Sequence, residues 1–237
     1  MRNFALSLLG ILIATSVNAQ TTLVFSGVQA PVVAISEEVL RKAYQRIGIQ
    51  IRIIKQPGKR ALRSSNSGKT DGEVMRSKGI NEEYSNLIMV PVPVNFVDIV
   101  VFTKNVEFTV NSPQSLKPYK IGIRRGVKIS ERLTKGLNTL VVDRQEQLLS
   151  ILDRGRVDVI LMSRLGGVAQ IKELKLRGIK ILEPPLATGS RYHYLHSKHE
   201  NLVTKITESL KKMEEGGEIK KIRNQYISKQ YQSYAPL

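Results

Sequence analysis

Two charged side chains, Glu73 and Arg76, stand three residues apart at the end of a short predicted strand, residues 70–75. A third charge, Arg60, precedes them in a predicted helix. Guanidinium groups pair with carboxylates through two parallel hydrogen bonds, and a carboxyl group in a cleft can act as an acid or a base. The segment 57–79 therefore predicts a place where a small charged molecule binds.

Each of these charges also has a purely structural interpretation. Arg60 lies near a helix start, where the helix dipole disfavours a cation, so we expect either an ion pair with Glu73 or a functional role. Arg76 is either a ligand contact or a solvated loop charge. Asp71 is expected to serve the turn before the strand. The residues alone leave these alternatives open.

The three histidines, His193, His196 and His199, recur at every third position. His193 falls in a predicted extended segment and the other two straddle a helix start, so the three do not share one helix face. A full ligand set with an acidic partner is also lacking. We expect no metal and no cofactor. The sequence also contains no recognisable nucleophile elbow and no Ser/His/Asp pattern, which favours a protein that is not an enzyme.

The N-terminus has the pattern of a signal peptide, residues 1–19. Arg2 gives the positive start, residues 4–14 form a short apolar run, and Ala19 ends a small-x-small pattern before a cut at Gln20. The apolar run is too short to span a membrane. The sequence thus predicts export to the periplasm.

The composition limits the classes of partner. The net charge of +17 favours anionic partners through long-range attraction. Nucleic acid is not expected, because the chain is predicted to be exported and no helix carries a continuous basic stripe with aromatic residues. The absence of cysteine excludes disulfides and thiol chemistry. The length suits two lobes of about 100 residues each.

Predicted strands and helices alternate along the chain, which indicates parallel α/β sheets. The first series has a helix that begins at Ser36 as its N-cap and ends before Gly48. Two extended runs within residues 87–102 are interrupted by Pro91 and Pro93. Strands are predicted at residues 21–25, 49–54, 70–75, 121–123, 140–142, 157–161 and 179–182.

After residue 104 the alternation restarts. Asp143 with Glu146 predicts a capping box, and Ser163 is expected to cap the helix after the apolar strand 157–161. Pro184-Pro185 predicts a stiff connector, and two helices, about 199–215 and 218–230, end the chain.

Three patterns in this order resemble the extracytoplasmic solute-binding proteins of family 3. They are residues 48–79 with Arg60-Ala61-Leu62 and Asp71-Gly72-Glu73, residues 120–126, and residues 156–161 with the tail 195–217. These are type II periplasmic binding proteins related to amino-acid receptors of ABC transporters. The resemblance covers nearly the whole chain after residue 19.

The resemblance implies a two-lobed α/β fold, each lobe a mostly parallel sheet flanked by helices. Lobe 1 is expected to comprise residues 20–102 and 187–237, and lobe 2 residues 103–186. It also implies a monomer that closes by hinge motion around a small solute for an ABC-type permease. A sensor subunit for a membrane signalling protein is the main alternative, and a dehydratase-like enzyme using Glu73 is a further one.

The resemblance implies particular ligand contacts. Arg76 matches the arginine that clamps a ligand carboxylate, whereas Ser163 stands where amino-acid receptors have an aspartate for the ammonium group. The basic turn after strand 121–123 faces an anion in the family, and only one of Arg124 and Arg125 is expected to point into a cleft. We therefore predict an anionic, carboxylate-bearing ligand. The candidate ligand-binding residues are Arg60, Glu73, Arg76, Asn95, Arg124, Gly126, Ser163 and Arg164.

Overall fold

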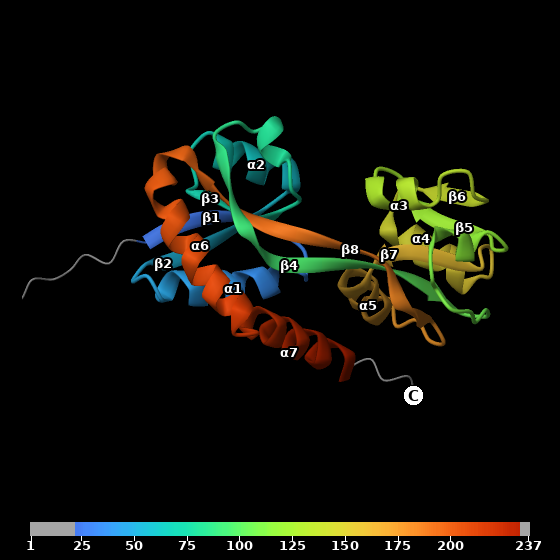
Figure 1. Ribbon diagram of the computed structural model, residues 1–237. Helices are drawn as coiled ribbons and strands as arrows, with labels where there is room; N and C mark the ends of the chain where they lie inside the picture. Colours follow the sequence, from blue (N-terminus) through green and yellow to red (C-terminus); the bar gives the residue numbers. More distant parts are fainter. Residues whose placement is uncertain (1–21, 233–237) are drawn as a thin grey trace, which may run out of the picture.

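Eight strands form one mixed sheet in the order β2-β1-β3-β8-β4-β7-β5-β6. At one end β1 pairs in parallel with β2 and β3, and at the other end β5 pairs in parallel with β6 and β7. The long strands β4 and β8 run antiparallel to each other between these two ends. Figure 1 shows the result, a first and a second lobe joined by β4 and β8.

The structure is a computed structural model that describes residues 22–232, with side chains up to Lys229. The predicted signal peptide, residues 1–19, lies outside the described residues. The first lobe contains β1 (Thr22–Val28), α1 (Val33–Gln45), β2 (Gln50–Gln56), α2 (Gly58–Asn66), β3 (Gly72–Arg76) and α6 (Glu200–Glu215). The second lobe contains β5 (Ile121–Arg124), α3 (Lys128–Leu133), β6 (Thr139–Val142), α4 (Gln145–Asp153), β7 (Val159–Ser163) and α5 (Arg164–Glu173). The linking strands are β4 (Leu87–Thr103) and β8 (Lys180–His196), and α7 (Glu218–Gln232) ends the described chain.

Each lobe has its own hydrophobic core. The first core packs α1 and α6 against β1, with Phe25 and Tyr44 fully buried. The second lobe has one apolar cluster that includes α4 and α5 and another that includes Leu116 and Ile121. This arrangement confirms the predicted two-lobed α/β class. The predicted boundaries at 102/103 and 186/187 fall inside β4 and β8, and they stay a prediction.

The amphipathic faces predicted for the helices are the faces that pack. In α1, Val39, Leu40, Ala43 and Tyr44 have no exposed surface. In α6, Ile206, Leu210 and Met213 are likewise fully buried, and Leu202 and Val203 pack at the edge of the same core. The 3.6-residue spacing was therefore a reliable signal here.

Two predicted helix caps are wrong. Helix α1 begins at Val33, and Ser36 lies inside it, where its buried hydroxyl donates to Met75 Sδ at 3.0 Å. The helix starts earlier because the carbonyls of Ala30 and Pro31 already accept the N–H groups of Val33 and Ala34. Helix α4 begins after Arg144, whose N–H donates to Gln147 Oε1 at 3.1 Å.

Asp143, the predicted cap of α4, forms an ion pair with Arg125 instead. The distance between Arg125 Nε and Asp143 Oδ1 is 2.8 Å. Ser163 does hold the N-cap position of α5, although its side chain makes no capping hydrogen bond.

The predicted interruption at Pro91 and Pro93 is also wrong. Pro91 and Pro93 lie within the single strand β4, and the pairing of β4 with β8 changes register around them. Pro184 and Pro185 lie within β8, at another shift, between the pairs Val101–Leu182 and Ile99–Ala187. Proline has no N–H to donate, so bulges let both strands continue through these positions.

Candidate functional site

The carboxyl ends of parallel strands from both lobes meet beside the linking strand β4. Val32, which follows β1, and Ser163, which ends β7, line one small pocket together with Phe96 and Asp98 of β4. The pocket has room for about one water molecule. Since β2 is in register with β1, and β5 with β7, the carboxyl ends of those strands lie along the same two edges.

Asp98 binds side chains from three other elements at this junction. Its Oδ2 accepts from Arg164 Nε of α5 at 3.2 Å and from Arg223 of α7 at 2.6 Å, and its Oδ1 accepts from Thr188 of β8 at 3.0 Å. Arg164 also forms a two-pronged ion pair with Glu183 of β8, one contact of which, from Nη2, is 2.8 Å. The side chains of Asp98 and Arg164 are about nine-tenths buried. Arg164 is therefore neutralised within the protein.

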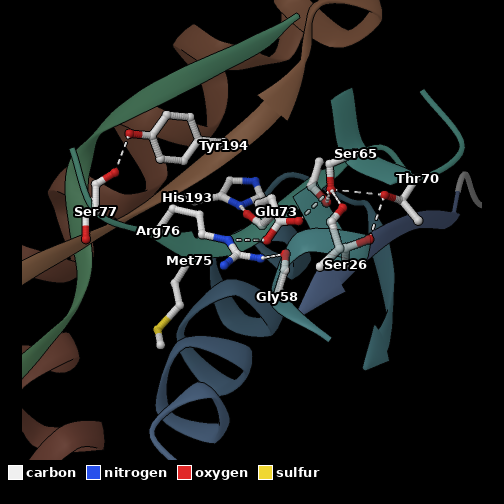
Figure 2. Close-up of polar contacts among 12 residues, drawn as sticks. Ser26, Gly58, Ser65, Thr70, Glu73, Met75, Arg76, Ser77, His193 and Tyr194 are labelled. Atoms are coloured by element: carbon white, nitrogen blue, oxygen red, sulfur yellow. Dashed lines mark hydrogen bonds and ion pairs between the residues drawn. The ribbon is translucent and has the colours of Figure 1, made fainter. Parts of the chain in front are cut away.

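Arg76 and Glu73 form a second buried ion pair, at the end of β3 (Figure 2). Nε of Arg76 donates to Glu73 Oε2 at 2.7 Å, and Nη2 donates to the carbonyl of Gly58 at 3.1 Å. Glu73 has no exposed surface, whereas Arg76 remains 15% exposed. Burial raises the pKa of Glu73, although Arg76 and Ser65 oppose this shift. The side chain of Arg76 is therefore mostly buried and paired with Glu73.

Hydroxyl groups support Glu73 from the opposite side in Figure 2. Ser65 donates to Glu73 Oε1 at 2.8 Å, and Thr70 Oγ1 lies 3.2 Å from Ser65 and 2.9 Å from Ser26. The predicted alternative of an Arg60–Glu73 ion pair is wrong, because Arg76 takes that place. Arg60 is exposed on the first turn of α2, and among the described residues its side chain makes no hydrogen bond or ion pair.

His193 lies fully buried behind this ion pair. Its Nδ1 is 2.7 Å from the carbonyl oxygen of Glu73, so Nδ1 carries the hydrogen, and Nε2 accepts from the Tyr44 hydroxyl at 2.9 Å. Burial lowers the pKa of His193 to about 4 and raises that of Tyr44 well above its usual value. Both side chains are therefore neutral supports of the first core. The described residues contain no group of three or more side chains suited to a metal ion.

The basic turn after β5 is partly neutralised by acids of its own lobe. Arg125 pairs with Asp143 at the exposed surface. The N–H of Gly126 donates to Glu131 Oε1 at 2.7 Å, and Lys128 lies 3.2 Å from Glu131 Oε2. These contacts lower the pKa of Glu131. The chain's own carboxylate therefore fills the N–H position at which we expected a ligand anion.

Arg124 and Asn95 differ in whether their side chains have hydrogen-bond partners. Arg124 is half-buried at the carboxyl end of β5, and its side chain makes no hydrogen bond or ion pair with the described residues. Asn95 is fully buried in β4, where its amide donates to the carbonyl of Val32 and its Oδ1 accepts from the N–H of Phe96. Asn95 thus fixes the loop after β1 to the linking strand.

Sequence reasoning missed the residues that hold these arginines. Asp98 lies in an apolar run of β4, and Glu183 and Arg223 are far away along the chain. A lone aspartate among Val, Ile and Phe was the one available signal, because a buried carboxylate needs a partner. Its three donors come from positions that no local pattern connects.

The architecture is that of the two-lobed type II periplasmic binding proteins. The chain resembles the GluR0 ligand-binding core in complex with L-glutamate, with a TM-score of 0.66, 12% identity, and coverage of 88% of this chain and 99% of that chain. It also resembles a histidine kinase sensor domain with similarity to periplasmic binding proteins, with a TM-score of 0.63, 16% identity, and coverage of 87% and 96%.

A third solved structure is an amino acid ABC transporter substrate-binding protein, AbpA, of Streptococcus pneumoniae, bound to L-arginine. Its TM-score is 0.61 at 14% identity, over 88% of this chain and 95% of that chain. At this level of identity, these similarities establish the fold. An uncharacterized protein of Shewanella oneidensis is 26% identical over 201 residues, which are 80% of this chain and 75% of that protein. No model of a known protein family matches the chain.

Proposed function

We propose that this protein is exported, binds a small solute between its two lobes without converting it, and presents it to a membrane protein. The observation that supports this best is the meeting of the carboxyl ends of β1 and β7 beside β4. Ligands of open parallel sheets bind outside the carboxyl ends of the strands. Two lobes joined by two long strands also suit a hinge motion that encloses a ligand. No helix of residues 22–232 is long and apolar enough to cross a membrane.

An anionic solute is supported by the arginines, because some are paired with acids of the protein and others are not. Glu73 neutralises Arg76, and Asp98 with Glu183 neutralises Arg164. Arg60 and Arg124 carry no acidic partner among the described residues, and they lie at the carboxyl ends of one strand from each lobe, after β2 and at the end of β5. A solute with two or more carboxylates would bridge these arginines across the lobes by charged hydrogen bonds.

The same junction disfavours an α-amino acid. Ser163 offers no negative charge to an ammonium group, and the neighbouring Asp98 already accepts from Arg164, Arg223 and Thr188. An ammonium group would have to displace an arginine from a buried carboxylate, which is costly. We therefore favour carboxylates without an amino group, bound by Arg60 and Arg124.

The membrane partner is either an ABC-type permease or a membrane sensor. The solved structures above include a substrate-binding protein of an amino acid ABC transporter and a histidine kinase sensor domain. In the same proposal, residues 20–102 with 187–237 and residues 103–186 move as two bodies, and the protein acts as a monomer.

Calorimetric titration of the chain from Gln20 tests the proposal, with succinate, glutarate, citrate, phosphate, L-glutamate and L-arginine as candidate solutes. We expect a di- or tricarboxylate to bind best. Arg124→Ala and Arg60→Ala should each weaken binding by about tenfold or more, the loss of one charged hydrogen bond.

Arg125→Ala is the matched control, because Arg125 is adjacent, two-thirds exposed and paired with Asp143. Its affinity should match that of the wild type. Preferential binding of an amino acid, or equal losses for Arg124→Ala and Arg125→Ala, would overturn the assignment of the anion site. Failure of every compound to bind would count against the carboxylate class.

A further inference from the structure

A groove lies against the linking strands β4 and β8. Its volume is about 540 Å³, and it is lined by residues of β4, β8 and the corner between α6 and α7. In Figure 1, α7 runs alongside these strands on the way from the first lobe to α5. A volume of this order suits a small organic molecule.

The floor of the groove is apolar. Phe96 of β4, Pro185 of β8 and Ile219 of α7 contribute to it. Ile219 is buried, whereas Phe96 and Pro185 are half-buried and offer surface to an occupant. An apolar body placed here would gain free energy by leaving water.

One wall of the groove offers hydrogen-bond donors. Lys220, Arg223 and Asn224 all line it, and their spacing of three and four residues places them on one face of α7. Lys220 has no acidic partner among the described residues. Arg223 uses Nη2 to hold Asp98, and its buried Nε has no acceptor within the described part of the chain.

The acidic residues that line the groove do not pair with Lys220 or Asn224, so these two side chains can bind a ligand. Asp98 is already shared by Arg164, Arg223 and Thr188. Glu214, near the end of α6, also lines the groove and is exposed to solvent. The chain as a whole carries a charge of +17, which draws anions toward any such surface.

We propose that this groove is a second binding site, for a small molecule with an apolar body and a carboxylate head. The body lies on Phe96 and Pro185, and the head pairs with Lys220 and accepts from Asn224. None of the residues lining this groove comes from the strand ends that face each other between the lobes. The groove shares Phe96, Asp98 and Arg223 with the small pocket at the junction, whereas Pro185, Lys220 and Asn224 line the groove alone.

Titration with sodium decanoate, below its micelle concentration, tests the proposal. Wild type should bind one decanoate, and Lys220→Ala should weaken binding by about tenfold, the loss of one charged hydrogen bond. Lys221→Ala is the matched control, because Lys221 is the neighbouring exposed lysine of α7 and does not line the groove. Its affinity should equal that of the wild type.

Three outcomes would overturn the proposal. They are no binding, equal losses in Lys220→Ala and Lys221→Ala, or a loss in Arg124→Ala with none in Lys220→Ala. Equal losses would reflect general attraction to a basic surface. A loss confined to Arg124→Ala would place decanoate between the lobes. Arg223 is left intact in these variants, because it also holds Asp98.

Discussion

Asp98 of β4 and Arg223 of α7 are joined by a hydrogen bond of 2.6 Å, which ties the C-terminal helix to the strand that links the two lobes. Arg164 of α5 binds the same carboxylate oxygen from the second lobe. Asp98 therefore connects β4 with α5, α7 and β8. The contact is mostly shielded from water, so removal of one partner costs more than it would in a surface ion pair.

Arg223→Ala is expected to loosen α7. Loss of a charged hydrogen bond to a nearly buried carboxylate should lower the free energy of unfolding by about 2 kcal/mol. Hydrogen exchange should rise first in α7 and at the start of α5. Glu183→Gln is the control, because Glu183 is 58% exposed and its replacement should cost about 0.5 kcal/mol or less. Unchanged exchange in α7 of Arg223→Ala would contradict this role.

Substitutions of Glu73 and Arg76 are predicted to have strongly non-additive effects on the free energy of unfolding. Arg76→Ala leaves a fully buried carboxylate without its cation, so we expect a loss of about 3 kcal/mol in the free energy of unfolding. Glu73→Gln in the Arg76→Ala background should recover much of this loss, because a neutral amide costs less to bury. Urea unfolding of the two single variants and the double variant measures the coupling. Additive losses would show that the two side chains act independently.

His193 predicts a dependence of stability on pH. In the folded protein the pKa of His193 is lowered from 6.5 to about 4 by burial. The unfolded chain therefore binds a proton that the folded chain rejects. The contribution of His193 is fully present above pH 6.5 and is lost as the pH falls toward about 4, a total of about 3 kcal/mol.

His193→Gln tests this contribution, because an amide can still donate to Glu73 and accept from Tyr44. Urea unfolding between pH 4 and 7 should give a flatter curve for His193→Gln than for wild type. His196→Gln, which makes the same exchange at a half-buried position, is the control variant. Parallel curves for wild type and His193→Gln would mean that another group carries the dependence.

Much of the fold could be predicted from the sequence, because apolar spacing in α1 and α6 and the alternation of strands and helices are local signals. The predicted interruption at Pro91 and Pro93 was wrong because β4 continues through both prolines with a change of register. The candidate site was predictable only in part. Arg76 was found from its strand, but whether a cation is free or neutralised depends on distant residues such as Asp98 and Glu73.

Gly72, the first residue of β3, is predicted to tolerate no side chain. The φ angle of Gly72 is +155°, and a Cβ added there would lie 2.1 Å from the carbonyl oxygen of Tyr194 on β8. That oxygen belongs to a backbone paired with β3, so it cannot move aside without separating the strands that place Glu73. Gly72→Ala should therefore destabilise by about 3 kcal/mol or more, as overpacking against backbone does.

Gly136→Ala is the matched control, because Gly136 also has a positive φ, +80°, but no atom lies within 4 Å of an added Cβ. It should cost about 1 kcal/mol, from the strained backbone alone. Thermal unfolding of the two variants separates the effects. Equal melting temperatures would mean that β3 and β8 can move apart at this contact at little cost. The position of Glu73 would then depend on its own hydrogen bonds and not on the close approach of the two strands.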